Sequence, residues 1–305
     1  MRIVVTGAGG FVGRRLVAML AGHDVVAVDV RKDGIPVSPR VQAIGGDLAD
    51  PAVLAAAFGE GCDAVVHLAT VPGGAAEENP ARAKRVNVDA TIALVDAAAR
   101  AGRRPRFVFA SSIAVFGAPL PSSVDDATPV LPKLLYGAHK AMMEQWIATL
   151  SRRGAIDGIS LRLPGVVARP RGPSGMKSAF LSDIFHTLTN GESAVVPVSP
   201  EATSWLISVD RAAQNLVHAL QFETEVMPPT RAVTLPALRV AMRDLVANIA
   251  RHAGTSAGTV RYKPDHDLES VFGAYPPLAT EVAEALGFAS DGELSTLVAT
   301  VLAAL

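Results

Sequence analysis

The stretch MRIVVTGAGGFVG, residues 1–13, decides the fold of this 305-residue chain. A short β-branched run at its start leads into Gly7, Gly10 and Gly13, which stand three residues apart. Apolar residues then recur at the spacing of a helix. The stretch therefore predicts a strand, a tight turn and a helix. Glycine in such a turn lets the backbone bend sharply and lets a bulky anion approach the helix N-terminus.

An acidic residue closes the second apolar run. Asp29 directly follows residues 25–28. It stands roughly 20 residues after the glycine turn, the separation at which a carboxylate meets the adenosine ribose hydroxyls of a dinucleotide. Arg31 could hold the 2′-phosphate of NADP, but Asp29 would repel that phosphate, so NAD is the expected cofactor.

Composition excludes several classes of protein. The chain is 50% hydrophobic and 19% charged, with a net charge of −1 and a pI of about 6.7, so neither nucleic acid nor an anionic membrane is an expected partner. Cys62 is the single cysteine, and the histidines are scattered, so no disulfide and no metal site are expected. No apolar run approaches ~18 residues, and no leader precedes the first strand, which predicts a cytoplasmic protein without a membrane span.

Strands and helices alternate through the first half of the chain. The expected strands cover residues 3–5, 25–28, 41–44, 62–66, 106–110 and 159–163, and the expected helices 11–20, 52–58, 80–101 and 136–151. Residues 71–78 are expected to be a mobile Pro/Gly-rich segment. The pattern predicts an α/β fold with a doubly wound parallel sheet, in which ligands bind at the carboxyl ends of the strands. Asp47, Thr70 and Ser112 all fall at that edge.

The alternation becomes irregular after residue 166. A basic Pro/Gly loop is expected over residues 169–178, a helix capped by Asp210 over 210–220, and a helix over 238–253. We therefore expect residues 1–167, joined by 205–235, to form the NAD-binding Rossmann domain. Residues 168–204 and 236–305 are expected to form a smaller, interleaved substrate lobe.

Tyr136 and Lys140 place a phenol and an ammonium four residues apart, on one face at the start of an expected helix. A tyrosine titrates near ~10, so acting as a base near neutrality requires roughly 4 kcal/mol of phenolate stabilisation. The Lys140 ammonium and a nicotinamide cation are plausible sources of it. Ser112, at the end of a strand, would then hold the substrate oxygen.

These segments resemble the extended short-chain dehydrogenase/reductase superfamily, the NAD-dependent epimerase/dehydratase group. The matching pieces are TGAGGFVG (6–13), Asp29, GDL (46–48), HLAT (67–70), Asn87, SSIAVFG (111–117), YGAHK (136–140) and LRLPGVV (161–167). The resemblance implies a catalytic set of Ser112, Tyr136 and Lys140, and a homodimer through the helices at 80–101 and 136–151. It implies that NAD binds Gly7, Gly10, Phe11, Val12, Gly13, Asp29, Asp47, Leu48, Leu68, Ala69, Thr70, Tyr136, Lys140, Pro164, Val166 and Val167.

Two departures from the group bear on the substrate. Relatives that act on nucleotide sugars commonly carry Asn where this chain has Gly165, and Arg where it has Thr203. The stretches at 111–121, 151–158, 161–170 and 215–220 instead resemble the D-erythronate dehydrogenase branch, whose members oxidise the 2-hydroxyl of a small sugar acid with NAD. A buried carboxylate needs a cation. The candidate substrate residues are Ser112, Arg169, Arg171, Lys177 and Trp205.

Two other functions are weighed against this dehydrogenase. One is an epimerase or dehydratase that keeps NAD tightly bound, although Ile113 and Ala114 stand where a dehydratase carries Asp and Glu. The other is a non-catalytic NAD sensor, a class that usually loses the tyrosine or the lysine. Both Tyr136 and Lys140 are present, which favours an enzyme.

Overall fold

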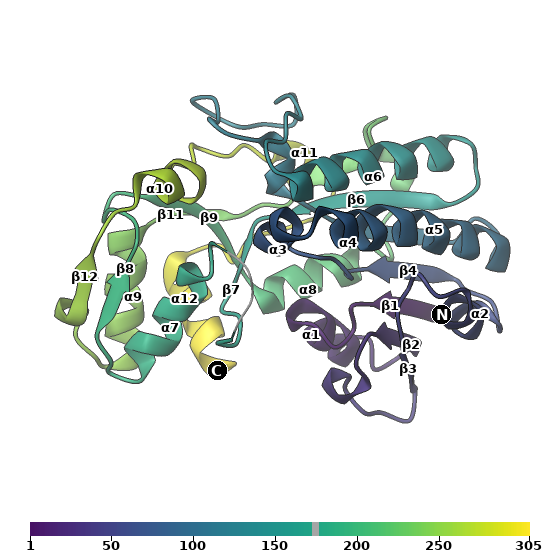
Figure 1. Cartoon of the computed structure of the whole chain (residues 1–305), viewed down its shortest axis with the longest axis horizontal. Helices are drawn as coiled ribbons and strands as arrows, with labels where there is room; N and C mark the ends of the chain where they lie inside the picture. The colour runs from purple at the N-terminus through teal and green to yellow at the C-terminus, as the bar shows by residue number, and fades with distance from the viewer. Residues whose placement is uncertain (173–176) are drawn as a thin grey trace.

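The computed structural model describes residues 1–172 and 177–305 (Figure 1). Its central sheet has seven parallel strands in the order β10-β6-β5-β4-β1-β2-β3. These strands are β1 (Arg2–Thr6), β2 (Asp24–Asp29), β3 (Val41–Gly45), β4 (Ala64–His67), β5 (Arg106–Ser112), β6 (Asp157–Leu163) and β10 (Ala232–Thr234). The order reverses between β1 and β4, where doubly wound sheets bind their ligands. The predicted α/β doubly wound parallel sheet is confirmed.

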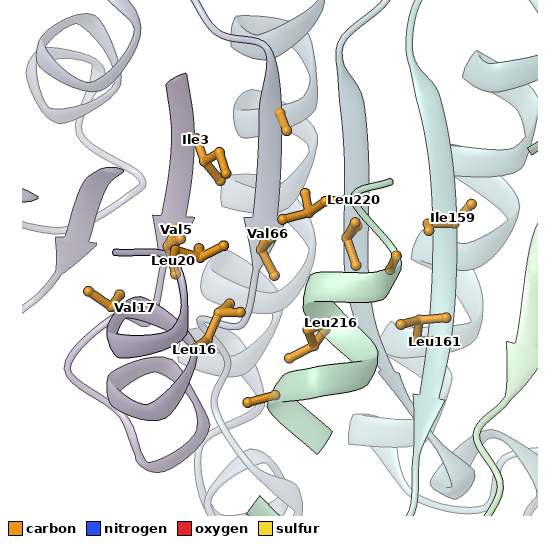
Figure 2. Packing of buried hydrophobic residues seen from close by; sticks show 14 of the residues in the cluster. Ile3, Val5, Leu16, Val17, Leu20, Val66, Ile159, Leu161, Leu216 and Leu220 are labelled. Atoms are coloured by element: carbon orange, nitrogen blue, oxygen red, sulfur yellow. The ribbon is translucent and has the colours of Figure 1, made fainter. Parts of the chain in front are cut away.

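Helices cover both faces of this sheet. One face packs against α1 (Phe11–Met19) and α8 (Val209–His218), and the other against α2 (Pro51–Phe58), α5 (Ala90–Ala101) and α6 (Leu135–Arg152). Figure 2 shows the first face, where Leu16 and Leu20 meet Val5 and Val66 of the strands, and Leu216 lies opposite. Burial of each such side chain contributes about 1.5–3 kcal/mol, which fixes both helices on the sheet.

The N-terminal caps of α2 and α8 were both predicted from the sequence. Asp50 caps α2 by accepting a hydrogen bond from Ala52 N, as its sequence predicts. The cap of α8 is Ser208, which accepts from Arg211 N, so the expectation that Asp210 is the cap was wrong. Asp210 lies in the first turn instead, where its carboxylate pairs with Arg15 of α1 at 2.6 Å.

The segment before α5 differs from expectation. Residues 71–78 were expected to be a mobile loop, but Gly73–Glu78 forms the helix α3, whose Glu77 carboxylate accepts a hydrogen bond from Leu135 N at 2.7 Å. The expected single helix over 80–101 consists of α4 (Pro80–Lys84), a π-helical turn at Arg85–Asp89 and α5. π turns are frequent at functional sites.

A second group of elements lies beside the carboxyl end of the sheet (Figure 1). A three-stranded sheet contains β7 (Gly165–Val167), β9 (Thr203–Ser208) and β11 (Leu238–Ala241), and a two-stranded one contains β8 (Ala194–Val196) and β12 (Val260–Tyr262). The helices are α7 (Phe180–Thr189), α9 (Met242–Ala253), α10 (His266–Phe272) and α12 (Leu294–Ala303), with α11 (Glu281–Ala285) nearer the central sheet. The helix expected over 238–253 begins only at Met242, so that expectation was wrong for its first four residues, which form β11 and pair with β9.

The chain between α10 and α11 joins the two groups, as Figure 1 shows. On one side, Thr203 N donates to Gly273 O at 2.7 Å and the Trp205 indole N–H donates to Pro276 O at 2.8 Å. On the other side, Val124 N donates to Pro277 O at 3.0 Å. We call residues 273–279 the crossing segment. The division of the chain into an NAD-binding domain and a substrate lobe stays a prediction.

Among the described residues, no helix is long and apolar enough to cross a membrane.

Candidate active site

The glycine turn lies at the carboxyl end of β1, beside the point where strand order reverses. Gly7 has φ of 70°, and a Cβ on it would lie 2.7 Å from Ala69 N. A Cβ on Gly13 would lie 2.1 Å from Gly7 O, so only glycine lets α1 start this close to the turn. No side chain caps α1. Among the described residues, the N–H groups of this helix N-terminus have no side-chain acceptor, so they could donate to the pyrophosphate of NAD.

Asp29 and Asp47 end neighbouring strands. Asp29 Oδ2 accepts a hydrogen bond from Gly9 N at 3.0 Å, which holds the carboxylate against the glycine turn. Asp47 accepts from Ala49 N at 2.9 Å and pairs with Arg85 of the π-helical turn. Both carboxylates thus lie at the sheet edge expected for the adenosine end of the cofactor, and the Leu48 side chain is buried beside them.

The backbone after β4 is held by Asn87, which the π-helical turn directs inward. Asn87 Oδ1 accepts from Thr70 Oγ1 at 3.0 Å and from Val71 N at 2.7 Å, and its amide donates to Val71 O at 3.0 Å. His67 supports the same segment between Thr6 and Thr91, with ring-nitrogen to hydroxyl distances of 2.6 and 2.9 Å. Residues 68–70, expected along the cofactor, are therefore fixed by buried polar contacts.

Tyr136, Lys140 and Ser112 are brought together by a close approach of α6 to the 3-10 turn (Ile113–Phe116) that follows β5. A Cβ on Gly137 would lie 2.2 Å from Ala114 O, so the glycine after Tyr136 is what permits this approach. Lys140 Nζ donates to Ala110 O at 2.7 Å and lies 5.5 Å from the centre of the Tyr136 ring. The role of Gly137 was missed from the sequence, although its place directly after the tyrosine was a usable signal.

The charges that affect the pKa values of Tyr136 and Lys140 differ from those expected. Burial raises the pKa of Tyr136, and the groups that oppose this rise are the Arg169 guanidinium and a hydrogen bond from Ser112. Burial also lowers the pKa of Lys140 to about 7, which Glu144 partly offsets. Arg169 is thus a cation that favours the Tyr136 phenolate, which the sequence did not indicate.

The other predicted substrate residues lie in different places. Arg169 is half-buried, with its guanidinium 5.9 Å from the centre of the Phe11 ring at the start of α1. Arg171 is exposed and pairs with Glu192 at 3.1 Å, and Lys177 is also exposed. Residues 173–176 of the expected basic loop lie outside the described residues. Only Arg169 of these cations is placed beside Tyr136.

Trp205 and the strand β7 form one side of this region. Trp205 is 1% exposed and its indole N–H already donates to the crossing segment, so a polar contact with a ligand would require that bond to break. Pro164, Val166 and Val167, expected near the nicotinamide, are buried where β6 leads into β7. Among the described residues, no group of three potential ligands could hold a metal ion.

A buried ion pair behind Lys140 was not foreseen. Arg162 of β6 and Glu144 of α6 form two hydrogen bonds of 3.0 and 2.8 Å. The available signal was the position of Glu144, one helical turn after Lys140.

Comparisons with known proteins show the family to which the chain is related. The model of the NAD-dependent epimerase/dehydratase family matches residues 3–230. The D-erythronate dehydrogenase of Cupriavidus necator is 36% identical, over 98% of this chain and 97% of its own length, and that of Haemophilus influenzae is 32% identical over 98% of both. The crystal structure of the nucleoside-diphosphate-sugar epimerase from Agrobacterium tumefaciens has a TM-score of 0.88 at 31% identity, over 98% of this chain and 92% of that one.

Proposed function

This chain belongs to the NAD-dependent epimerase/dehydratase family of extended short-chain dehydrogenases/reductases, and from that membership we propose that it oxidises a secondary hydroxyl of a small sugar acid. It is an NAD-dependent dehydrogenase, and its cofactor is NAD. The observation that carries the substrate proposal is the likeness to two D-erythronate dehydrogenases over nearly the whole chain. A D-erythronate-like 2-hydroxy acid is the proposed substrate.

Three side chains would perform the proton chemistry. The Tyr136 phenolate accepts the hydroxyl proton, the Ser112 hydroxyl donates to the substrate oxygen, and the Lys140 ammonium favours the phenolate. Bound NAD supplies the hydride acceptor, so the substrate carbon loses a hydride as its oxygen loses a proton. The closeness of Lys140 Nζ to the Tyr136 ring supports these roles.

Arg169 is the proposed partner of the substrate carboxylate. Its guanidinium lowers the pKa of Tyr136 and lies beside the Phe11 ring. From this position it could bind a ligand that contacts both the phenol and the cofactor. Arginine binds carboxylates through two parallel hydrogen bonds, which would place the hydroxyl carbon reproducibly. Trp205 and Lys177 stay predictions as further substrate residues.

Replacing Arg169 with Gln is expected to lower kcat/KM for the sugar acid about ten- to hundredfold, because a charge-assisted hydrogen bond contributes about 1.5–3 kcal/mol. The measurement is NADH absorbance over a panel of C4–C6 aldonic, uronic and 2-hydroxy acids, with the matching uncharged polyols. Most of the loss should fall on KM for the acids.

Arg243→Gln, which removes an exposed arginine paired with Glu201, serves as the control. A panel in which no acid yields NADH would remove the proposed function. An equal loss for acids and polyols, or a loss seen in Arg171→Gln instead, would remove Arg169 as the carboxylate partner.

An epimerase with tightly bound NAD is the second candidate, favoured by the structural likeness to the nucleoside-diphosphate-sugar epimerase. Purified protein that carries stoichiometric nucleotide and forms no net NADH with any acid of the panel would support it. Gly165 argues against a nucleotide-sugar substrate, because it stands where such relatives commonly carry Asn, and a Cβ there would lie only 3.0 Å from Trp205 O.

We also propose a homodimer, with α6 at its interface. Met142 and Trp146 stand one turn apart on α6 and are 53% and 39% exposed, which is unusual for large apolar side chains. Replacing Trp146 with Glu is expected to shift the protein from dimer to monomer in sedimentation velocity. Val195→Glu, which changes an exposed residue on β8, should leave the mass unchanged. A wild-type protein that is monomeric at every concentration contradicts the proposal.

A further inference from the structure

A buried ion pair joins three elements behind the candidate active site. The two hydrogen bonds between Arg162 and Glu144 leave these side chains only 8% and 4% exposed. Ser111 Oγ donates a third hydrogen bond to Glu144 at 2.5 Å, and the guanidinium lies 5.1 Å from the centre of the Phe116 ring. Removing two charges from water is costly, and hydrophobic residues of similar volume often replace such pairs without loss of stability. Stability alone therefore does not explain this pair.

The position of the pair points to the site. Glu144 lies one turn after Lys140 on the buried face of α6. Ser111 directly precedes Ser112 on β5, and it stands opposite Arg162 of β6 in the strand register. The Glu144 carboxylate thus contacts β5, the strand that carries Ser112. Glu144 itself belongs to α6, the helix that carries Tyr136 and Lys140.

The surroundings of Lys140 contain few charges. From β5 it meets the Ala110 carbonyl and, at 4.6 Å, the Phe109 ring. His67 of β4 is uncharged at neutral pH, because burial lowers its pKa to about 3.

The remaining groups come from α6 and β6. Tyr136 and His139 belong to the same helix as Lys140, and burial disfavours the charged form of both. Arg162 of β6 is a second cation. Among the described residues, Glu144 is the carboxylate that acts on Lys140.

We propose that Glu144, held by Arg162 and Ser111, is a positioning residue that keeps Lys140 in its ammonium form beneath Tyr136. Through Ser111 the same carboxylate fixes the end of β5 that presents Ser112. The inference rests on the roles proposed above for Tyr136 and Lys140. It assigns to the buried pair a function in proton transfer rather than in folding.

The direct test is the titration of Lys140 by NMR in protein labelled at the lysine side chains. The six lysines are Lys32, Lys84, Lys133, Lys140, Lys177 and Lys263, and Lys140→Met identifies the Lys140 signal. In Glu144→Gln the carboxylate is gone and Arg162 is left unpaired, so the ammonium is less favoured. We expect the titration midpoint of Lys140 to move about one pH unit lower, a tenfold loss of ammonium at a given pH.

A matched control breaks another, partly buried ion cluster. Asp157 pairs with Arg106 and Arg231 at the opposite ends of β5 and β6. Asp157→Asn should lower thermal stability but leave the Lys140 midpoint unchanged. If the control moves the midpoint as much as Glu144→Gln does, the effect is structural and the proposal is overturned.

A second variant covers the case in which Glu144→Gln does not fold. Glu144→Gln combined with Arg162→Met removes both charges and leaves no unpaired buried ion. The Lys140 midpoint should still fall, but by less than in Glu144→Gln, because the loss of the Arg162 cation offsets part of the loss of the carboxylate. An unchanged midpoint in a folded variant overturns the proposal.

Activity gives an independent readout. We expect Glu144→Gln to lower kcat at pH 7 more than it raises KM for the sugar acid, and a loss confined to KM counts against the proposal. If wild-type protein forms no NADH with any acid, the proposed function fails, and the lysine titration still decides the role of Glu144.

Discussion

Replacing Tyr136 with Phe is expected to abolish NADH formation while NAD binding stays near wild-type affinity. The ring stays in place, because Phe fills the same half-buried position on α6. The group that would accept the hydroxyl proton is lost, and a positioned acid or base typically contributes about 10²–10⁴-fold to the rate. The two measurements are turnover on the best acid of the panel and NAD affinity by calorimetry.

Another tyrosine provides a control for this experiment. Tyr262 lies on β12, and Tyr262→Phe should form NADH at the wild-type rate. Because burial raises the pKa of Tyr136 in the absence of cofactor, wild-type activity should also increase with pH as the phenolate becomes populated. Retained turnover in Tyr136→Phe would assign the base to another residue.

Replacing Gly13 with Ala is expected to weaken NAD binding about ten- to hundredfold. The added Cβ would lie 2.1 Å from Gly7 O and 2.8 Å from Ala8 Cα, so α1 must move away from the turn. Overpacking of this kind costs about 1–3 kcal/mol, and here the displaced element is the helix N-terminus that faces the pyrophosphate. Calorimetric titration with NAD measures the effect.

Gly22→Ala provides the matched control, because a Cβ at that position meets nothing within 4 Å. Its NAD affinity should equal that of the wild type. If Gly13→Ala binds NAD equally well, the pyrophosphate does not lie at the N-terminus of α1.

Local sequence signals were sufficient for the central sheet. The glycine turn, the apolar runs and their alternation with helical periodicity predict the doubly wound sheet that the structure contains. The errors concern residues whose conformation depends on distant partners. The segment Gly73–Glu78 is helical although rich in small residues, and it packs against α6, where Glu77 bonds to Leu135. Such tertiary contacts override local propensity.

The candidate site was predictable to a similar extent. Helical spacing alone indicates that Tyr136 and Lys140 share a face, and Ser112 follows from the end of an apolar strand. The charges around them were not predictable in the same way. Arg169 acts on Tyr136 from a segment 33 residues away, and Glu144 meets Arg162 only because α6 packs against β6. The spacing of residues along the sequence predicts neither the closeness of Arg169 to Tyr136 nor that of Glu144 to Arg162.

The crossing segment has a consequence for the order in which the protein is made. Every strand of the central sheet except β10 lies before residue 164, so most of that sheet can pair while the ribosome is still adding the second half. The indole of Trp205 obtains its hydrogen-bond partner only when Pro276 has emerged. The contacts between the second group of elements and the central sheet are therefore completed late in synthesis, after most strands of the central sheet are available to pair.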